Sequence, residues 1–118
     1  MKRAYDRDRA RNLIPLLGSI TREIAERAHE ARILQGRLGK LEDEPMCEEL
    51  VDLRAKLASH RREIRLSLKE LERLGCAMDE DAPGQIRIPG RDGDFDHGFQ
   101  FDPGSYSLRR VESGINIA

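Results

Sequence analysis

Hydrophobic residues recur at steps of three and four along the first part of the chain, which is the spacing of one helix face. The pattern forms a heptad seam with these members: Leu13, Leu17, Ile20, Ile24, Ala31, Leu34, Leu38 and Leu41. Asp6 is a candidate N-cap, so the pattern predicts a helix over residues 7–41. Pro15 lies inside this helix and removes one backbone donor, so we expect a kink there or a short preceding turn.

A second seam with the same spacing follows Pro45 and stops before Gly75. Its members are Met46, Leu50, Leu53, Leu57, His60, Ile64, Ser67, Leu71 and Leu74. Proline suits the first position of a helix and glycine suits its C-terminal cap, so this seam predicts a helix over residues 45–74. The acidic run at residues 42–44 predicts the turn between the helices. The predicted fold is mainly α, an antiparallel coiled-coil-like helical hairpin.

In an antiparallel hairpin, the residue numbers of facing residues have a nearly constant sum, which is 87 or 88 for the two seams. This arithmetic pairs Leu38 with Leu50, Leu34 with Leu53 and Ile24 with Ile64. It also places Arg27 opposite His60 on the otherwise apolar seam. We interpret this pair as a polar layer that fixes the register, in preference to a buried switch or a ligand site.

Charged residues beside the seam give the register moderate support. Arg37 would face Glu49 and Glu30 would face Lys56, and both pairs are attractive. Glu23 would face Glu63, and this pair is repulsive. Because exposed ion pairs contribute only a few tenths of a kcal/mol, the hydrophobic seam decides the register.

Glycine and proline are frequent in the chain after the second helix, which predicts short strands and turns. Residues 85–88 form one strand candidate. Residues 98–101 and 106–109 alternate as strands do, and the Asp102-Pro103-Gly104-Ser105 sequence between them suits a type II turn. This hairpin would place Phe99, Phe101, Tyr106 and Leu108 on one face, and residues 114–117 would form a last strand or a frayed end. The whole chain is predicted as one α+β domain, a hairpin at 7–74 and a small β-hairpin tail within 75–118.

Composition limits the classes of protein to which the chain belongs. Of its 118 residues, 38% are hydrophobic and 36% are charged, and no stretch of about 20 apolar residues predicts a membrane span. Cys47 and Cys76 stand in no disulfide or zinc pattern, and no apolar signal core follows Met1, so we expect a cytoplasmic protein. The small size and few aromatic residues disfavour a large pocketed enzyme.

Two passages of the chain have a recognisable order and spacing. Tyr5-Asp6 precedes Ala10 and the segment Leu13-Ile14-Pro15-Leu16-Leu17, and after the hairpin come Leu74-Gly75 and the passage from Asp81 to Pro89. In these passages the chain resembles an uncharacterised bacterial family, "domain of unknown function 2203". The resemblance covers roughly residues 5–90 and implies a helical hairpin with a small β tail, but no established reaction. The family's tail usually carries Cys-Trp, Gly-Glu and Trp-His; this chain has no tryptophan and departs from the pattern after Gly93. Any activity that resides in those residues would not carry over.

Asp92, Asp94 and Asp96 have the 1, 3, 5 spacing of a calcium loop, so they are the candidate metal ligands. Position 6 is His97 where glycine is needed, and position 12 is Pro103 where a bidentate glutamate belongs. We therefore interpret this stretch as a solvated acidic turn. The sequence predicts no catalytic residue, no cofactor and no resident metal.

Basic residues are concentrated in the second predicted helix and in the first residues of the chain. They suggest a contact with nucleic acid or the ribosome: Arg61, Arg62, Arg65, Lys69, Arg73, Lys2, Arg3, Arg7, Arg9 and Arg11. The net charge of −1 and the lack of aromatic residues on that face favour a solvated surface instead. Our leading hypothesis is a non-enzymatic interaction or scaffold module. We expect a homodimer through four apolar residues beyond the seam: Ile14, Leu16, Leu66 and Leu68. The alternatives are a nucleic-acid-associated protein, and an enzyme or metal protein with its site in the tail.

Overall fold

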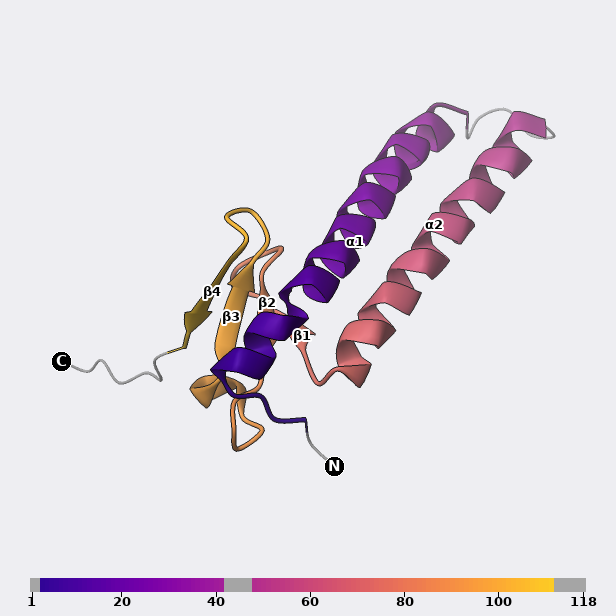
Figure 1. Ribbon diagram of the computed structural model, residues 1–118. Helices are drawn as coiled ribbons and strands as arrows, with labels where there is room; N and C mark the ends of the chain where they lie inside the picture. The colour runs from indigo at the N-terminus through magenta and orange to yellow at the C-terminus, as the bar shows by residue number, and fades with distance from the viewer. Residues whose placement is uncertain (1–2, 42–47, 112–118) are drawn as a thin grey trace. The chain divides into compact units, whose positions relative to one another are not determined.

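The computed structural model describes residues 3–41 and 48–111. Its elements in chain order are α1 (Arg7–Leu41), α2 (Glu48–Arg73), β1 (Ala77–Met78), β2 (Ile86–Ile88), a 3-10 turn (Phe95–His97), β3 (Phe99–Asp102) and β4 (Ser107–Arg110) (Figure 1). The predicted class, a helical hairpin followed by a small β region, is confirmed. No helix within the described ranges is long and apolar enough to cross a membrane.

The chain folds as two compact units, and α1 and α2 each contribute to both. Among the described residues, the sheet unit comprises 3–21 and 68–111, and the helical arm comprises 22–41 and 48–67. In each unit the helical segments supply one apolar stripe. In the sheet unit a β-sheet is added to that stripe.

The helical arm has a narrow core of leucines from both helices. Its buried members are Leu34, Leu38, Leu50, Leu53 and Leu57. The predicted register is confirmed at two polar pairs: Arg37 Nη2 lies 3.2 Å from Glu49 Oε1, and Arg27 Nη1 lies 3.2 Å from His60 Nδ1. Glu30 and Lys56, both within the described helices, form no ion pair, so that expected contact is absent.

The helix ends follow the capping signals in the sequence. Asp6 Oδ1 accepts a 2.9 Å hydrogen bond from the Arg9 N–H, which confirms Asp6 as the N-cap of α1. α1 then runs unbroken through Pro15, so no separate turn precedes the proline. The predicted start of α2 at Pro45 lies outside the described residues.

The C-terminal end of α2 is closed by Gly75 in the left-handed conformation, with φ +79°. The Gly75 N–H donates to the Glu72 carbonyl at 2.9 Å, and the Cys76 N–H donates to the Leu71 carbonyl at 3.0 Å. These are the two hydrogen bonds of a Schellman motif, so the predicted glycine cap is confirmed.

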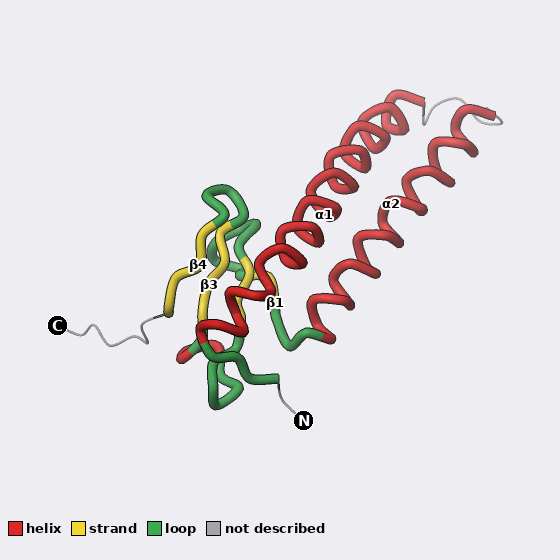
Figure 2. The backbone as a smooth tube through the Cα atoms, viewed as in Figure 1, coloured by secondary structure: helices red, strands yellow, loops and turns green. Residues whose placement is uncertain are grey.

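The sheet unit holds a four-stranded antiparallel meander in the order β1-β2-β3-β4 (Figure 2). Ile86 pairs with Phe101 and Ile88 pairs with Phe99, so the apolar residues of β2 and β3 share one face. The largest fully buried side chains of the unit are Phe101, Leu17, Leu71, Ile86 and Ile88. Residues from the first helix, the second helix and the sheet therefore form one core.

The sheet differs from the predicted tail in two ways. β1 was not predicted, because a two-residue strand shows no alternation. The expected type II turn is wrong: Gly104 does not have positive φ, and the left-handed residue is Tyr106, with φ 53°. The loop runs from Pro103 to Tyr106, because Asp102 pairs with Ser107. Asp102 stabilises it, since its carboxylate accepts hydrogen bonds from the Gly104 N–H at 2.9 Å and the Ser105 hydroxyl at 3.1 Å.

Tyr106 connects this loop to α1 within the sheet unit. Its ring packs edge-on against Phe101, with centroids 5.6 Å apart. A Cβ at Gly18 of α1 would lie 2.9 Å from a ring carbon of Tyr106. Gly18 thus gives the ring room to lie against the helix backbone. The expected grouping of Phe99, Phe101 and Leu108 on one face is confirmed, with Tyr106 reaching that face from the loop. The proposed last strand at residues 114–117 lies outside the described residues.

Candidate functional site

The loop between β2 and β3 is fixed by two glycines whose backbones touch. A Cβ at Gly90 would lie 2.0 Å from the His97 carbonyl oxygen, and one at Gly98 would lie 1.9 Å from the Ile88 carbonyl oxygen. Any side chain here would collide with backbone, so only glycine fits at both positions. The Gly90 N–H also donates to the Asp94 carbonyl at 3.0 Å. Residues 91–97 therefore project from a rigid neck.

The segment before α1 is tied to this neck by Tyr5. The Tyr5 N–H lies 3.3 Å from the carbonyl oxygens of both Pro89 and Gly90. Its hydroxyl donates a 2.8 Å hydrogen bond to the Leu74 carbonyl. Burial raises the pKa of the phenol, so the hydroxyl remains a donor at neutral pH. These contacts hold the start of α1 beside the loop.

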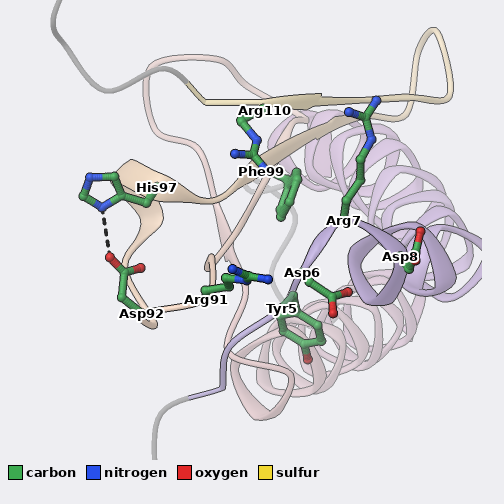
Figure 3. Close-up of a pocket in the computed structure, with 9 residues that line it drawn as sticks. All are labelled: Tyr5, Asp6, Arg7, Asp8, Arg91, Asp92, His97, Phe99 and Arg110. Atoms are coloured by element: carbon green, nitrogen blue, oxygen red, sulfur yellow. Dashed lines mark ion pairs between the residues drawn. The ribbon is translucent and has the colours of Figure 1, made fainter.

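A cavity of about 580 Å³ opens between the loop, the start of α1 and the sheet (Figure 3). This volume is in the usual range for small-molecule sites. Its lining residues all belong to the sheet unit: Tyr5, Asp6, Arg7, Asp8, Arg91, Asp92, His97, Phe99 and Arg110. The lining is therefore strongly charged, with one aromatic ring from β3.

Two arginines line the cavity together with that ring. The Arg110 guanidinium carbon lies 5.6 Å from the centroid of the Phe99 ring, in cation–π contact. The Arg91 side chain extends from the loop into the same cavity, beside Tyr5 (Figure 3). Within residues 3–41 and 48–111, no carboxylate forms an ion pair with either guanidinium.

The candidate metal ligands are only partly brought together. Asp92, Asp94 and His97 place one ligand atom each within 4.8 Å of one another, and all three side chains are exposed. Asp96 does not join them, because its carboxylate lies 3.8 Å from Arg87 Nη2 instead. The donor set is thus two carboxylates and an imidazole, which differs from the oxygen ligands of a calcium loop.

His97 forms an ion pair with Asp92 inside this cluster when its ring is protonated. The distance from His97 Nδ1 to Asp92 Oδ2 is 3.1 Å. Burial opposes ionisation of Asp92, but hydrogen bonds from the N–H groups of Asp94 and Asp92 and the charge of His97 outweigh it. The pKa of Asp92 is therefore lowered. Asp92 is an anion at neutral pH, already partnered by its neighbours.

The family model for an uncharacterized conserved protein, DUF2203, matches residues 3–95. The chain belongs to the DUF2203 family. Curated proteins and solved structures gave no match. The resemblance inferred from the sequence is thereby confirmed.

The DUF2203 match divides the lining of the cavity into two parts. Tyr5, Arg91 and Asp92 lie within the matched residues, whereas Phe99 and Arg110 lie beyond their end. The neck glycine Gly90 lies inside the match and its partner Gly98 lies outside it. The rigid loop thus starts within the matched residues and returns through residues beyond the end of the match.

In the arm, the predicted polar layer is present. Arg27 bonds His60 as predicted and also donates from Nε to Glu23 Oε1 at 2.8 Å. Glu23 is thus engaged by its own helix, which relieves the repulsion expected from Glu63. Both Arg27 and His60 are half-buried, as expected of a polar layer at the edge of a narrow core. His29 lies exposed beside them.

The basic residues of α2 lie at the surface. Arg61 donates to the Gln35 side chain of α1 at 2.9 Å, and Arg62 and Arg65 are exposed.

Cys76 is buried, and burial raises the pKa of its thiol to about 12, so it is not a nucleophile at neutral pH. Cys47 lies outside the described residues.

Sequence reasoning missed the cavity and the role of His97. The cavity residues are separated by most of the chain, and only the closure by Tyr5 brings them together. In the sequence, His97 marks only a departure from the calcium-loop pattern, and that pattern does not predict it as a ligand. The signal available was Asp94 three residues before it, a spacing that a 3-10 turn places on one side.

Proposed function

We propose that this protein is a homodimeric scaffold module whose arms associate through the outer face of α2. The observation that carries the proposal is the exposure of two large apolar side chains there. Val51 is 65% exposed and Leu66 is 48% exposed. Both lie on the side of the helix opposite the buried Leu53 and Leu57. A two-helix arm buries only one stripe of each helix, so a further cover for this face adds stability.

The outer face is arranged so that a second copy in antiparallel orientation fits it. Ala58 and Ser59 lie at its centre, and both are small and exposed. Val51 precedes this centre by as many residues as Leu66 follows it. A two-fold axis at Ala58–Ser59 therefore places Val51 of one copy against Leu66 of the other, twice. The small central residues allow the helix axes to approach closely.

The charges on this face agree with the same axis. Asp52 precedes the centre by as many residues as Arg65 follows it, and both side chains are exposed. The antiparallel pairing sets Asp52 against Arg65 of the second copy, whereas a parallel pairing would set like charges together. Such ion pairs contribute about 0–1 kcal/mol each, so their main effect is to select the orientation.

This pairing accounts for the acidic and basic ends of α2 together, which nucleic-acid binding does not. Glu48 and Asp52 lie at one end of the face that carries Arg62 and Arg65 at the other. A phosphate backbone would be repelled from the acidic end.

We also propose a cytoplasmic location, which the buried free thiol of Cys76 supports.

The test is the oligomeric state of three single variants, measured by sedimentation velocity over a concentration series. The full chain is expected to form a dimer with a dissociation constant on the order of 10 µM, because the face is small. Val51→Lys and Leu66→Lys each bury a charge at the contact, so either should give monomers. Ile33→Lys is the matched control, since Ile33 is 46% exposed but lies on α1.

Charge exchange tests the orientation. Asp52→Arg or Arg65→Asp alone sets like charges together twice and should weaken the dimer by several-fold. The double variant restores opposite charges at both contacts and should recover the dimer. A monomeric wild-type protein, or a double variant as weak as the singles, contradicts the proposal. Salt-dependent RNA binding by the wild-type protein that is lost in Arg65→Asp and absent in the double variant would assign the face to nucleic acid instead.

A further inference from the structure

We infer that the cavity of the sheet unit binds a small organic oxyanion, a phosphate or a carboxylate, between Arg91 and Arg110. The first observation is convergence. Arg110 is held over the Phe99 ring, and Arg91 extends from the rigid loop into the same cavity, beside Tyr5 (Figure 3). One guanidinium group can bind two oxygens of a phosphate or a carboxylate at the same time. Two guanidinium groups that line one opening therefore favour an anionic ligand.

The second observation is that neighbouring carboxylates are engaged elsewhere. Asp6 Oδ1 accepts the Arg9 N–H as the cap of α1. Asp92 lies 3.1 Å from His97 Nδ1 and also accepts the Asp94 N–H. Asp8, the remaining acidic lining residue, extends from the helix on the far side of the cavity from Arg91 (Figure 3). Within the described parts of the chain, Arg91 and Arg110 are left without an ion-pair partner.

The third observation is preorganisation. The Gly90–Gly98 neck fixes the loop that carries Arg91, and the Val111 N–H bonds the Gly98 carbonyl at 2.9 Å, which fixes the end of β4 beside Arg110. Both guanidinium-bearing backbones are therefore tied to the same glycine, and little backbone ordering remains to be lost on binding.

The size of the cavity indicates an anion with an organic part. A volume of about 580 Å³ exceeds the need of a single phosphate group, and the Tyr5 and Phe99 rings supply apolar surface beside the arginines. The exposed imidazole of His97 lines the same opening and offers a further hydrogen-bonding group.

The experiment is a titration of the isotope-labelled full chain followed by amide chemical shifts, in buffer containing a metal chelator. Three probes distinguish the sources of the oxyanion: inorganic phosphate, adenosine monophosphate and succinate. At least one is expected to saturate at or below about 10 mM and to shift the amides of Arg91, Phe99 and Arg110. A saturating response to an organic probe that exceeds the response to inorganic phosphate would confirm the need for an organic part.

Variants locate the binding. Arg91→Gln and Arg110→Gln should each weaken it by about tenfold or more, because each removes a charge-assisted contact. Arg109→Gln is the matched control: Arg109 is exposed on the same strand, and its side chain lies on the other face of the sheet. The inference is overturned if no probe saturates, or if Arg109→Gln weakens binding as much as the other two. The result is independent of the oligomeric state of the arm.

Discussion

The helical arm and the sheet unit are stabilised by different kinds of contact. The arm depends on side-chain area: five leucines along one seam form its core, and a Cβ at Gly36 or Gly39 would meet nothing within 4 Å. The sheet unit depends on backbone fit, because Gly90 and Gly98 bring carbonyl and amide groups into direct contact. An arm of this kind accepts a methyl group at these glycines and loses stability with apolar volume. The sheet unit also has an apolar core, but in addition it accepts no side chain at Gly90 or Gly98.

The largest effect is expected from Gly98→Ala in the sheet unit. The new Cβ would lie 1.9 Å from the Ile88 carbonyl oxygen, so the backbone itself would have to shift. We expect a loss of more than about 3 kcal/mol in the free energy of unfolding. Tyrosine fluorescence isolates this unit, because Tyr5 and Tyr106 both belong to it. Gly104→Ala is the control, since its nearest neighbour is the flexible Asp102 side chain at 3.2 Å. Equal stability of the two variants would contradict backbone fit as the basis of the unit.

In the arm, Leu53→Ala should cost about 2–4 kcal/mol through lost burial and the cavity left behind. Leu53 is 3% exposed within the leucine cluster. Denaturant unfolding followed by far-ultraviolet circular dichroism measures the loss. Val51→Ala, on the exposed side of the same helix, serves as the control and should change stability by less than about 0.5 kcal/mol in the monomer. A small effect at Leu53 would mean that the seam is not the source of the arm's stability.

A buried polar contact in the sheet unit should give an intermediate effect that depends on pH. Gln100 is 5% exposed, and its Nε2 donates to Asp79 Oδ2 at 2.8 Å and to the Gln85 side chain. Gln100→Leu should cost about 1–3 kcal/mol, because the hydrogen bonds of the buried Gln100 amide to its two part-buried partners are lost.

The pH dependence follows from Asp79. Hydrogen bonds from the Asp81 N–H and from Gln100 lower the pKa of this carboxyl from its ordinary value of 3.8. The resulting stability is present above 3.8 and is lost as the pH falls through the lower, folded-state pKa. Melting temperatures between about pH 5 and pH 2 should therefore fall less steeply in Gln100→Leu than in the wild-type protein. Parallel slopes would show that Gln100 does not act on Asp79.

The polar layer of the arm should give a smaller effect. Arg27→Leu and His60→Leu each remove one partner of a half-buried pair, and the double variant removes both. We expect a coupling of about 0.5–1 kcal/mol between them, and a double variant that is neutral or more stable than the wild-type protein. Thermal melts of the two single variants and the double variant measure it. Additive losses would show that the two residues do not interact.

The smallest effect should be a gain in the arm. Gly36→Ala replaces a poor helix former where nothing lies within 4 Å of the new methyl group. Stability should rise by about 0.5–1 kcal/mol. Denaturant unfolding followed by circular dichroism detects this change, and Gly39→Ala should repeat it. A loss of stability would show that the outer surface of α1 is covered, which would remove half of the contrast between the two units.

The elements of the arm were predictable because its determinants are local or periodic. The cap at Asp6, the seam leucines and the Arg27–His60 pair all follow from helical spacing. The sheet unit was less predictable from the sequence. β1 is too short to show an alternation of apolar and polar residues, and the conformation of Tyr106 is set by its packing against Phe101 and Gly18. The cavity depends on contacts between distant segments, which periodicity does not report. Of the candidate metal ligands, Asp92 and Asp94 were predictable from their spacing. Asp96 is not in the cluster, because its carboxylate pairs with Arg87, and His97 supplies the third ligand atom instead.

The hydrogen bond from the Tyr5 hydroxyl to Leu74 joins positions 69 residues apart, and this separation sets an order of events during synthesis. The arm has its partners close in sequence, so it can form as soon as residues 22–67 have left the ribosome. The first turns of α1 have no such partners, because Ala10 and Leu17 are buried only once the strands exist. During that interval their apolar side chains remain accessible to chaperones and proteases. The sheet unit is therefore begun first and completed last.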